Sequence, residues 1–211
     1  MECINRIRLA GKMVSLPVYD HTVLGEAFYK MLVSAKRLSG TADLLPVTVS
    51  ERLMDTEREG EPGIGSAIEI EGQLRSYNHR DENGSHLIIT VFARDVFFPD
   101  EELVMGDENY VELAGHICKP VVYRTTPFQR EISDVLLAVG RRYGKSDYLP
   151  CIAWGRNARY AGELSVNDML LIRGRMQSRE YQKTLPDGSV EQRTAYEISI
   201  SALERIEDQS F

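Results

Sequence analysis

The sequence contains few of the residues that build metal sites or disulfide frameworks. Its three cysteines, Cys3, Cys118 and Cys151, are far apart and form no Cys-x-x-Cys pair. This excludes a disulfide framework and a structural zinc site of the usual spacing. The four histidines show no metal-ligand spacing, and no His-Glu-x-x-His motif occurs. We therefore expect the protein to need no metal and no other cofactor.

Nucleophile motifs and phosphate-binding loops are missing as well. No Gly-x-Ser-x-Gly elbow occurs. The glycine-rich stretch at residues 60–65 lacks the lysine and the following helix of a phosphate loop. We expect a protein that is not an enzyme.

Long apolar runs are also absent. The first dozen residues carry charges throughout and lack the apolar core of a signal peptide. Elsewhere the apolar runs are only a few residues long, which is too short to cross a membrane. These features predict a cytoplasmic protein without membrane contact.

The net charge of −7 argues at first against a nucleic-acid partner, but the charge is unevenly distributed. Residues 1–98 hold 11 Lys and Arg against 14 Asp and Glu, and residues 99–108 hold five acids and no base. Residues 109–206 hold 14 bases against 11 acids, and 11 of these bases are arginine. The second half is therefore mildly basic within an acidic chain, which is a weak indication of function.

An internal repeat relates the two halves of the chain. Residues 5–11 match residues 109–115 at an offset of 104, and an offset of 102 carries residues 72–76 onto 174–178. The first offset also relates several single positions: Tyr19 to Tyr123, Arg37 to Arg141, Gly40 to Gly144, Asp43 to Asp147 and Pro46 to Pro150. We infer two copies of one domain of about a hundred residues.

Alternating patterns predict an all-β fold in both copies. In the second copy we expect strands near residues 110–118, 132–140, 148–154, 169–176 and 194–203, and a helix at 157–164. Five strands with a helix between the third and fourth are the order of an OB-fold barrel. In the first copy we expect strands near residues 4–12, 27–37, 45–50, 67–74 and 86–97, with residues 52–63 mostly loop.

The predicted organisation is therefore two tandem OB-folds. A diverged first domain takes residues 1–98, and an acidic linker with Pro99 at its start takes residues 99–108. The second domain takes residues 109–206. Residues 207–211 form a short acidic end with a terminal phenylalanine, Phe211.

Basic and aromatic residues alternate in three places of the second copy. This is the mixture that a single strand needs, because cations contact phosphates and aromatic faces stack on any base. We list as candidate binding residues Tyr148, Trp154, Tyr181 and Tyr143, with Arg141, Arg142, Arg156, Arg173, Arg175 and Arg179.

Each candidate also has a structural alternative. Trp154 alone would more often pack in the core, and the alternation in its strand leaves open which face points inward. Tyr148 and Tyr181 are equally compatible with packed and exposed positions. One of Arg141 and Arg142 can simply pair with Asp147.

The second copy resembles the bacterial single-stranded DNA-binding protein family. The resembling segments are residues 109–115, 136–139, 152–158 and 174–181, and the last two are the most specific. The first copy resembles the family more faintly through residues 5–11, 44–47 and 72–78.

The resemblance implies a sequence-tolerant protein that binds single-stranded DNA in replication, recombination or repair, associated with the nucleoid. It also implies an assembly with four OB domains, which a two-domain chain provides as a homodimer, and contacts with replication and repair proteins. The family's stacking positions fall on Tyr148, Trp154 and Tyr181, and with less certainty on Tyr143.

The chain departs from the family pattern in two places. Ser50 stands in the first copy where Trp154 stands in the second, although Tyr77 remains near the place of Tyr181. The long tail of the family is replaced by residues 206–211, so docking of partners by Phe211 is a weaker expectation. The alternative is an OB-fold adaptor that binds proteins, and RNA remains a further possible ligand.

Overall fold

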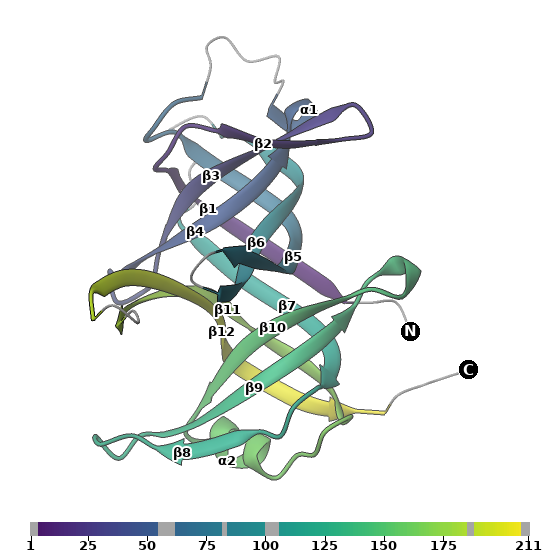
Figure 1. The fold of residues 1–211 in the computed structure, drawn as a ribbon, viewed down its shortest axis with the longest axis vertical. Coiled ribbons are helices and arrows are strands. Elements are labelled where there is room, and N and C mark those ends of the chain that lie inside the picture. Colours follow the sequence, from purple (N-terminus) through teal and green to yellow (C-terminus); the bar gives the residue numbers. More distant parts are fainter. Residues whose placement is uncertain (1–3, 55–61, 82–83, 100–105, 185–187, 208–211) are drawn as a thin grey trace. The chain divides into compact units, whose positions relative to one another are not determined.

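The structure is a computed structural model that describes residues 4–54, 62–81, 84–99, 106–184 and 188–207 (Figure 1). Its contacts divide the chain into two compact units. The first unit comprises Arg6–Arg75 and Thr90–Tyr110, and the second comprises Met1–Asn5, Ser76–Ile89 and Val111–Phe211. A segment of the first repeat, Ser76–Ile89, therefore belongs with the second repeat. Most of the predicted linker and the end at Phe211 lie outside the described residues.

In the first unit, the strands form a closed barrel. Their order is β2-β3-β4-β6-β5-β1, and a β1–β3 pairing closes the ring, with β4 and β6 parallel. The elements are β1 (Asn5–Met13), β2 (Val18–Val23), β3 (Glu26–Lys36), β4 (Ala42–Ser50), α1 (Glu51–Met54), β5 (Ala67–Asp81) and β6 (Gly84–Phe97).

The second unit repeats this arrangement. Its order is β7-β11-β12-β10-β9-β8, a β7–β9 pairing closes the ring, and β10 and β12 are parallel. The elements are β7 (Glu108–Ile117), β8 (Val122–Thr125), β9 (Glu131–Gly140), the 3-10 turn η2 (Arg142–Gly144), β10 (Ser146–Trp154), α2 (Arg156–Gly162), β11 (Met169–Thr184) and β12 (Val190–Ile206).

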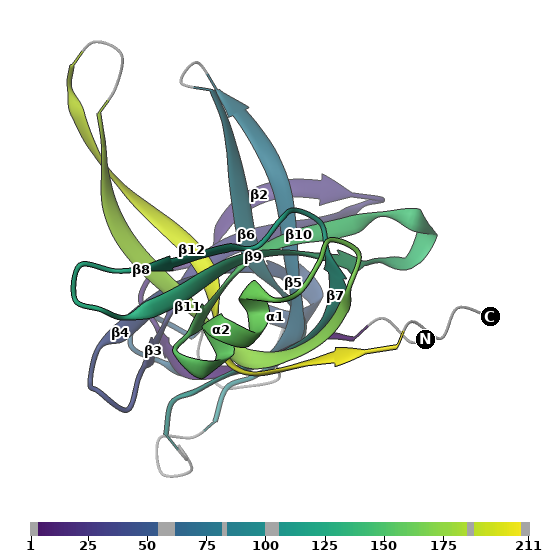
Figure 2. The same cartoon turned by 90° about the horizontal axis from the view of Figure 1, so that it is seen from below.

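Helix α2 closes one end of the second barrel (Figure 2). Ala158 and Ala161 are fully buried, and the hydroxyl of Ser133 donates a hydrogen bond of 2.7 Å to the carbonyl of Ala158. These small side chains let the helix lie close to the strands. In the described part of the chain, no helix is long and apolar enough to cross a membrane.

The inward face of β10 is now defined. Leu149, Cys151 and Ala153 are buried on it, whereas Tyr148 and Trp154 are exposed on the other side. Burial raises the pKa of the Cys151 thiol, so this side chain is a neutral part of the core. The alternation that the sequence left undecided therefore places both aromatic residues outward.

Two expectations about the strands were wrong. No strand was predicted between residues 118 and 132, but the edge strand β8 lies there, and β2 is its counterpart in the first unit. All four residues of β8 are exposed, so no apolar alternation marks it. The hairpin strands β11 and β12 also extend much farther than predicted, to Thr184 and from Val190, because polar arm residues pair without burying a face.

Four glycines of the repeat stand where strands cross closely. In the second unit, a Cβ added at Gly174 would lie 2.2 Å from the carbonyl oxygen of Ser199, and one at Gly115 would lie 2.5 Å from that of Ala138. Gly11 and Gly72 make the corresponding approaches in the first unit. The glycines recur in both copies because only a residue without Cβ fits these crossings.

Replacement of Gly174 by alanine is expected to destabilise the protein by about 1–3 kcal/mol or more, because β11 and β12 must separate to admit the methyl group. Thermal unfolding followed by circular dichroism measures the effect. Gly63→Ala is the matched control, since nothing lies within 4 Å of its added Cβ. Equal melting temperatures for the two variants would contradict the close crossing.

Candidate nucleic-acid interface

The outer face of β10 carries two exposed aromatic side chains. Tyr148 is 49% exposed and Trp154 is 40% exposed, at opposite ends of the strand. Between them on the same face lie Pro150 and Ile152, the latter 7% exposed. The result is a stripe with an aromatic ring at each end and apolar residues between, which suits the faces of successive bases.

Tyr181, the third predicted aromatic residue, lies on the same outer side of the second barrel as Tyr148 and Trp154. Ile152 of β10 is in register with Ser199 of β12, which is in register with Arg175 of β11. Residues that are directly opposite point to the same face, and the side-chain period of a strand is two. Arg179 and Tyr181 therefore share the outer side with Arg175.

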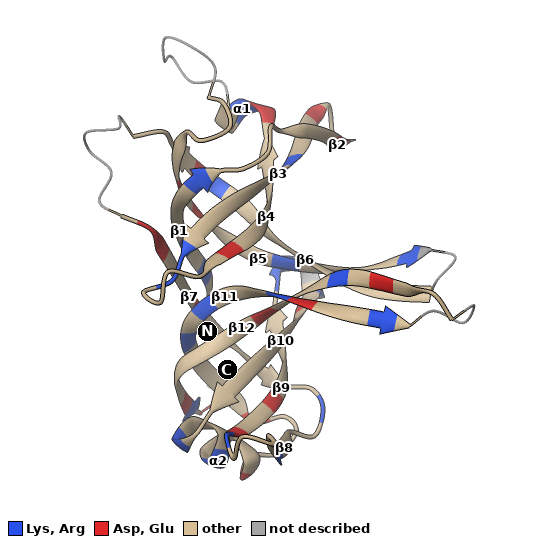
Figure 3. Ribbon diagram, turned by 90° about the vertical axis from the view of Figure 1, so that its left-hand side faces the viewer, with Lys and Arg blue, Asp and Glu red and all other residues tan. Residues whose placement is uncertain are grey.

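Tyr181 itself is paired with an arginine. The ring is 37% exposed, and the guanidinium carbon of Arg179 lies 5.8 Å from its centroid. Such a cation over an aromatic ring fixes the orientation of both groups. The hairpin arm that carries them extends beyond the ring of strands (Figure 2), and it bears charges of both signs (Figure 3).

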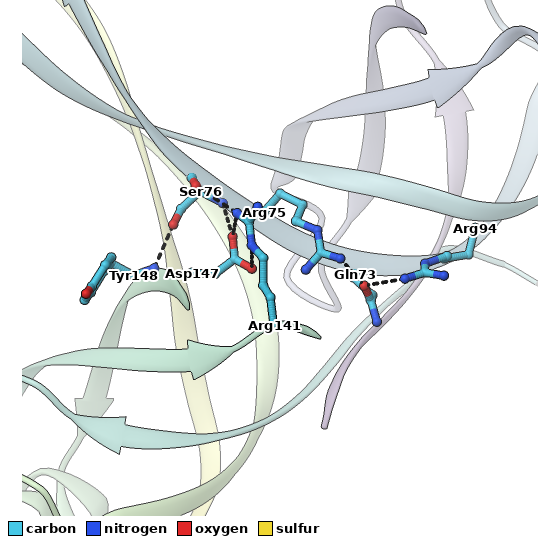
Figure 4. A network of polar contacts seen from close by, with 7 residues as sticks. All are labelled: Gln73, Arg75, Ser76, Arg94, Arg141, Asp147 and Tyr148. Carbon is cyan, nitrogen blue, oxygen red and sulfur yellow. Dashed lines mark hydrogen bonds and ion pairs between the residues drawn. The ribbon is translucent and has the colours of Figure 1, made fainter. Parts of the chain in front are cut away.

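Arg141 has a different setting from the one that phosphate binding requires. It forms an ion pair with Asp147, whose side chain has no exposed surface, and the Nε–Oδ2 distance is 2.6 Å (Figure 4). The same guanidinium donates a hydrogen bond of 3.0 Å to the carbonyl of Ser76. Of the two alternatives for this loop, the structure therefore has Arg141 as the partner of Asp147.

Ser76 attaches the distal part of the β5–β6 hairpin to the second barrel. Its backbone N–H donates to the Asp147 carboxylate at 2.6 Å, and its hydroxyl accepts from the backbone N–H of Tyr148 at 2.7 Å. Tyr77, which follows directly, is 42% exposed. The structure thus brings the Tyr77 backbone next to Tyr148, although sequence reasoning assigned Tyr77 to a thinner site in the first domain.

The remaining candidate arginines divide into two groups. Arg173 forms an ion pair of 2.8 Å with Glu112, and Arg175 donates to the side chain of Gln177 at 3.2 Å. Arg142 and Arg156 are exposed. Neither forms an ion pair with a carboxylate in the part of the chain that the structure describes. The side chain of Tyr143 lies outside the described residues.

The outer face of β4, which corresponds to that of β10, carries no aromatic residue, although Phe28 of β3 and Phe92 of β6 are in register with Ser50 and Thr48. Ser50, at the position of Trp154, donates a hydrogen bond to the carboxylate of Glu26, and Leu44 stands at the position of Tyr148. A stacking surface like that of β10 is therefore absent from β4 within the described residues. Acidic Glu26 and Glu51, which accepts from the backbone of Ala27, disfavour a phosphate there.

Sequence reasoning missed Ser76 altogether. The offset of 102 that relates Ser76 to Ser178 was visible, but a repeated serine gives no indication of its partner. Only the long-range contact with Asp147 reveals its role, because the two residues are 71 positions apart.

Comparison with known proteins agrees with this geometry. Residues 108–206 match the model described as the single-strand binding protein family. Single-stranded DNA-binding protein 1 of Streptococcus pyogenes serotype M18 is 31% identical over 81 residues, which are 35% of this chain and 62% of that protein. The chain thus spans about three fifths of that curated relative.

Two solved structures share the fold along nearly the whole chain. The wild-type single-stranded DNA binding protein from Thermus aquaticus has a TM-score of 0.77 at 22% identity, covering 99% of this chain and 95% of that one. A deletion mutant of that protein has a TM-score of 0.76 at 21% identity, with 98% and 96% covered. The predicted all-β fold with two tandem OB-folds is confirmed.

Arg141 and its neighbour Arg142 are expected to behave differently on substitution. Arg141→Ala leaves the Asp147 carboxylate buried without its cation, which should cost about 3 kcal/mol. Arg142→Ala removes an exposed side chain, and such changes are usually within about 0.5 kcal/mol. Chemical denaturation of both variants measures this difference. A stable Arg141→Ala protein would show that the pair contributes nothing to the second unit.

Proposed function

Because residues 108–206 belong to the single-strand binding protein family, we propose that the chain binds single-stranded DNA without sequence preference. The observation that carries the proposal is the outer face of β10, where Tyr148 and Trp154 are exposed at 49% and 40%. Large aromatic rings left half exposed on a barrel wall contribute little to the core. They are suited to stacking on bases, whose faces are alike in every sequence.

The path of the single-stranded DNA follows from the outer side of the second barrel, which the candidate aromatic residues share. Tyr148 and Trp154 mark the two ends of β10, and Tyr181 continues the surface on the β11–β12 arm. Each stacked base should contribute about 1–3 kcal/mol. Ser76 fixes the backbone of the β5–β6 hairpin beside Tyr148, and Tyr77, which follows it, presents a ring that is 42% exposed on this hairpin.

Phosphate contacts should come mainly from the exposed arginines. Arg142 lies in the loop that leads into β10, Arg156 follows Trp154 at two residues, and Arg179 lies against Tyr181. Arginine is suited to both roles, since its planar group pairs with phosphate and also stacks. Arg141 and Arg173 already form ion pairs with carboxylates, so their contribution is to position the strands of the second barrel.

The biological setting that fits this activity is replication, recombination or repair, where single strands are exposed. We keep one alternative for the first unit. Its face lacks the tryptophan and carries Ser50 hydrogen bonded to Glu26, which favours contact with protein over contact with DNA. In that case the chain combines a DNA-binding second unit with a first unit that serves as an adaptor.

Trp154→Ala is expected to weaken binding to oligo-dT by about 1–3 kcal/mol, or roughly fivefold to a hundredfold, because one stacked base is lost. Trp154 is the only tryptophan, so quenching of its emission by oligo-dT reports stacking directly in the unmodified protein. Binding should weaken as salt rises.

Duplex DNA is the control ligand for this titration, and oligo-U tests whether RNA binds equally. The matched control variant is Val166→Ala, which shortens a 41% exposed side chain in the second unit away from β10. Absence of quenching at low salt, together with no mobility shift, would overturn the DNA-binding function. The protein-binding alternative would then apply to both units.

A homodimer with four barrels is the assembly that we propose for this function. The observation that supports this homodimer is that charges at equivalent positions of the two repeats have opposite signs. Arg8 and Glu71 face each other across β1 and β5, whereas Glu112 and Arg173 do so across β7 and β11. At these two positions the outward face of the first barrel is therefore opposite in sign to the second-barrel face of another copy.

Light scattering is expected to give twice the mass of the chain at low salt. Glu71→Arg should weaken the dimer, because it makes the two faces alike in sign at this position. Glu163→Arg, an exposed change directly after α2, is the control. A monomer at all protein concentrations would refute the assembly without affecting the binding test.

A further inference from the structure

The turn between β8 and β9, residues 126–130, is held rigidly by its own hydrogen bonds. The backbone N–H of Gln129 donates to the carbonyl of Thr126 at 2.8 Å, and that of Thr126 donates to the carbonyl of Arg130 at 2.8 Å. The Thr126 hydroxyl accepts from the backbone N–H of Arg130 at 3.1 Å. Pro127 follows Thr126 and fixes the first corner of the turn.

Phe128 stands at the second corner of this turn and is 87% exposed. The turn is complete without its side chain, since backbone groups, Thr126 and Pro127 make every contact that closes it. The ring therefore serves no purpose in folding. A large aromatic group held out on a fixed backbone loses little conformational freedom on binding, which favours a role in recognition.

The turn adjoins the candidate DNA-binding face. Trp154 of β10 is directly opposite Ile132 of β9, and Ile132 is directly opposite Arg124 of β8. Arg124 thus lies two strands from Trp154, or about 10 Å, in the same row. The backbone N–H of Gly155 donates to the carbonyl of Glu131 at 2.9 Å, so the chain after Trp154 touches the residue that follows the turn.

Charges around the turn favour an anionic ligand. Arg130 is exposed within it, and Arg156 is exposed at the start of α2. The acids nearby already hold cations, because Asp134 pairs with Arg124 at 3.0 Å and Glu131 pairs with Arg159 at 2.9 Å. In the described part of the chain, Arg130 forms no ion pair with a carboxylate. Around β8 and α2, this end of the second unit carries Lys and Arg alongside Asp and Glu (Figure 3).

From the rigid turn, the exposed ring and the position of the turn beside the row Trp154–Ile132–Arg124, we propose that Phe128 is a further base-stacking residue. The single strand leaves Trp154, crosses β9 and β8, and places a base on Phe128, with Arg130 against the neighbouring phosphate. This inference rests on the proposed function and extends its site to the β8–β9 hairpin, which the predicted binding residues did not include.

The first unit provides a matched control. The tip of its β2–β3 hairpin also presents an apolar side chain, Leu24, which is fully exposed. Leu24 is aliphatic and is followed at two residues by Glu26, so it offers neither a π-face nor a cation. Both hairpin tips can thus be changed with the same low cost in stability, but only one should affect DNA binding.

The test moves the fluorescent reporter from β10 to the turn. In a Trp154→Phe background, Phe128→Trp makes position 128 the only tryptophan, and Leu24→Trp does the same for the first unit. Oligo-dT is titrated into each protein at low salt, with binding followed independently by mobility shift. Phe128→Ala in the otherwise unmodified protein measures the loss of affinity.

We expect quenching of the tryptophan at position 128 and none at position 24. Phe128→Ala should bind oligo-dT about fivefold or more weakly, at an unchanged melting temperature, whereas Leu24→Ala should bind normally. If Trp154 of the unmodified protein is quenched but position 128 is not, and Phe128→Ala binds normally, this inference is wrong and the proposed function stands. If Trp154 is not quenched and no complex forms, the proposed function fails first.

Discussion

A carboxylate without exposed surface is the constraint on which both units depend. Asp43 and Asp147 stand at equivalent places in the two repeats and are both fully buried. An ionised carboxylate in such a place must have a cation and hydrogen-bond donors. Arg37 and Arg141, six residues earlier in each case, provide the cation at hydrogen-bond distance. The β3–β4 loop of the first barrel and the β9–β10 loop of the second are thus fixed at both ends.

The second of these pairs also organises the candidate site. Asp147 accepts the backbone N–H of Ser76, and the hydroxyl of Ser76 accepts that of Tyr148. A buried charge therefore fixes the start of β10, whose outer face carries Tyr148 and Trp154, and holds the β5–β6 hairpin beside it. Rigid placement of exposed rings lowers the entropy that is lost when bases stack on them. In this way, the interaction that stabilises the fold also positions the proposed binding surface.

The strands with a buried face could be predicted from the sequence, because alternation of apolar and polar residues reports burial. The internal repeat predicted two barrels, because matching segments at a nearly constant offset imply the same pattern of strands in both copies. The edge strand β8 was missed because all of its residues are exposed. The orientation of Trp154 could not be derived, since Cys151 and Ala153 on one face are nearly as apolar as Ile152 and Trp154 on the other. The sequence left two roles open for Arg141, contact with phosphate or pairing with Asp147. The burial of Asp147, which only the structure shows, decides in favour of the pairing.

The two repeats differ most at positions where the fold places the weakest constraint on the side chain. The close crossings keep glycine in both copies, and the buried Arg–Asp pair is kept with the same sign, because a low-dielectric site tolerates no other arrangement. The exposed cross-strand pair is kept with its sign reversed, Arg8 and Glu71 against Glu112 and Arg173, since attraction in water needs opposite charges but not a given order. The outer face of β4 and β10 is not kept: Trp154 on β10 is Ser50 on β4. The barrel fold accommodates either tryptophan or serine at this position, which is consistent with the proposed role of the Trp154 ring in stacking.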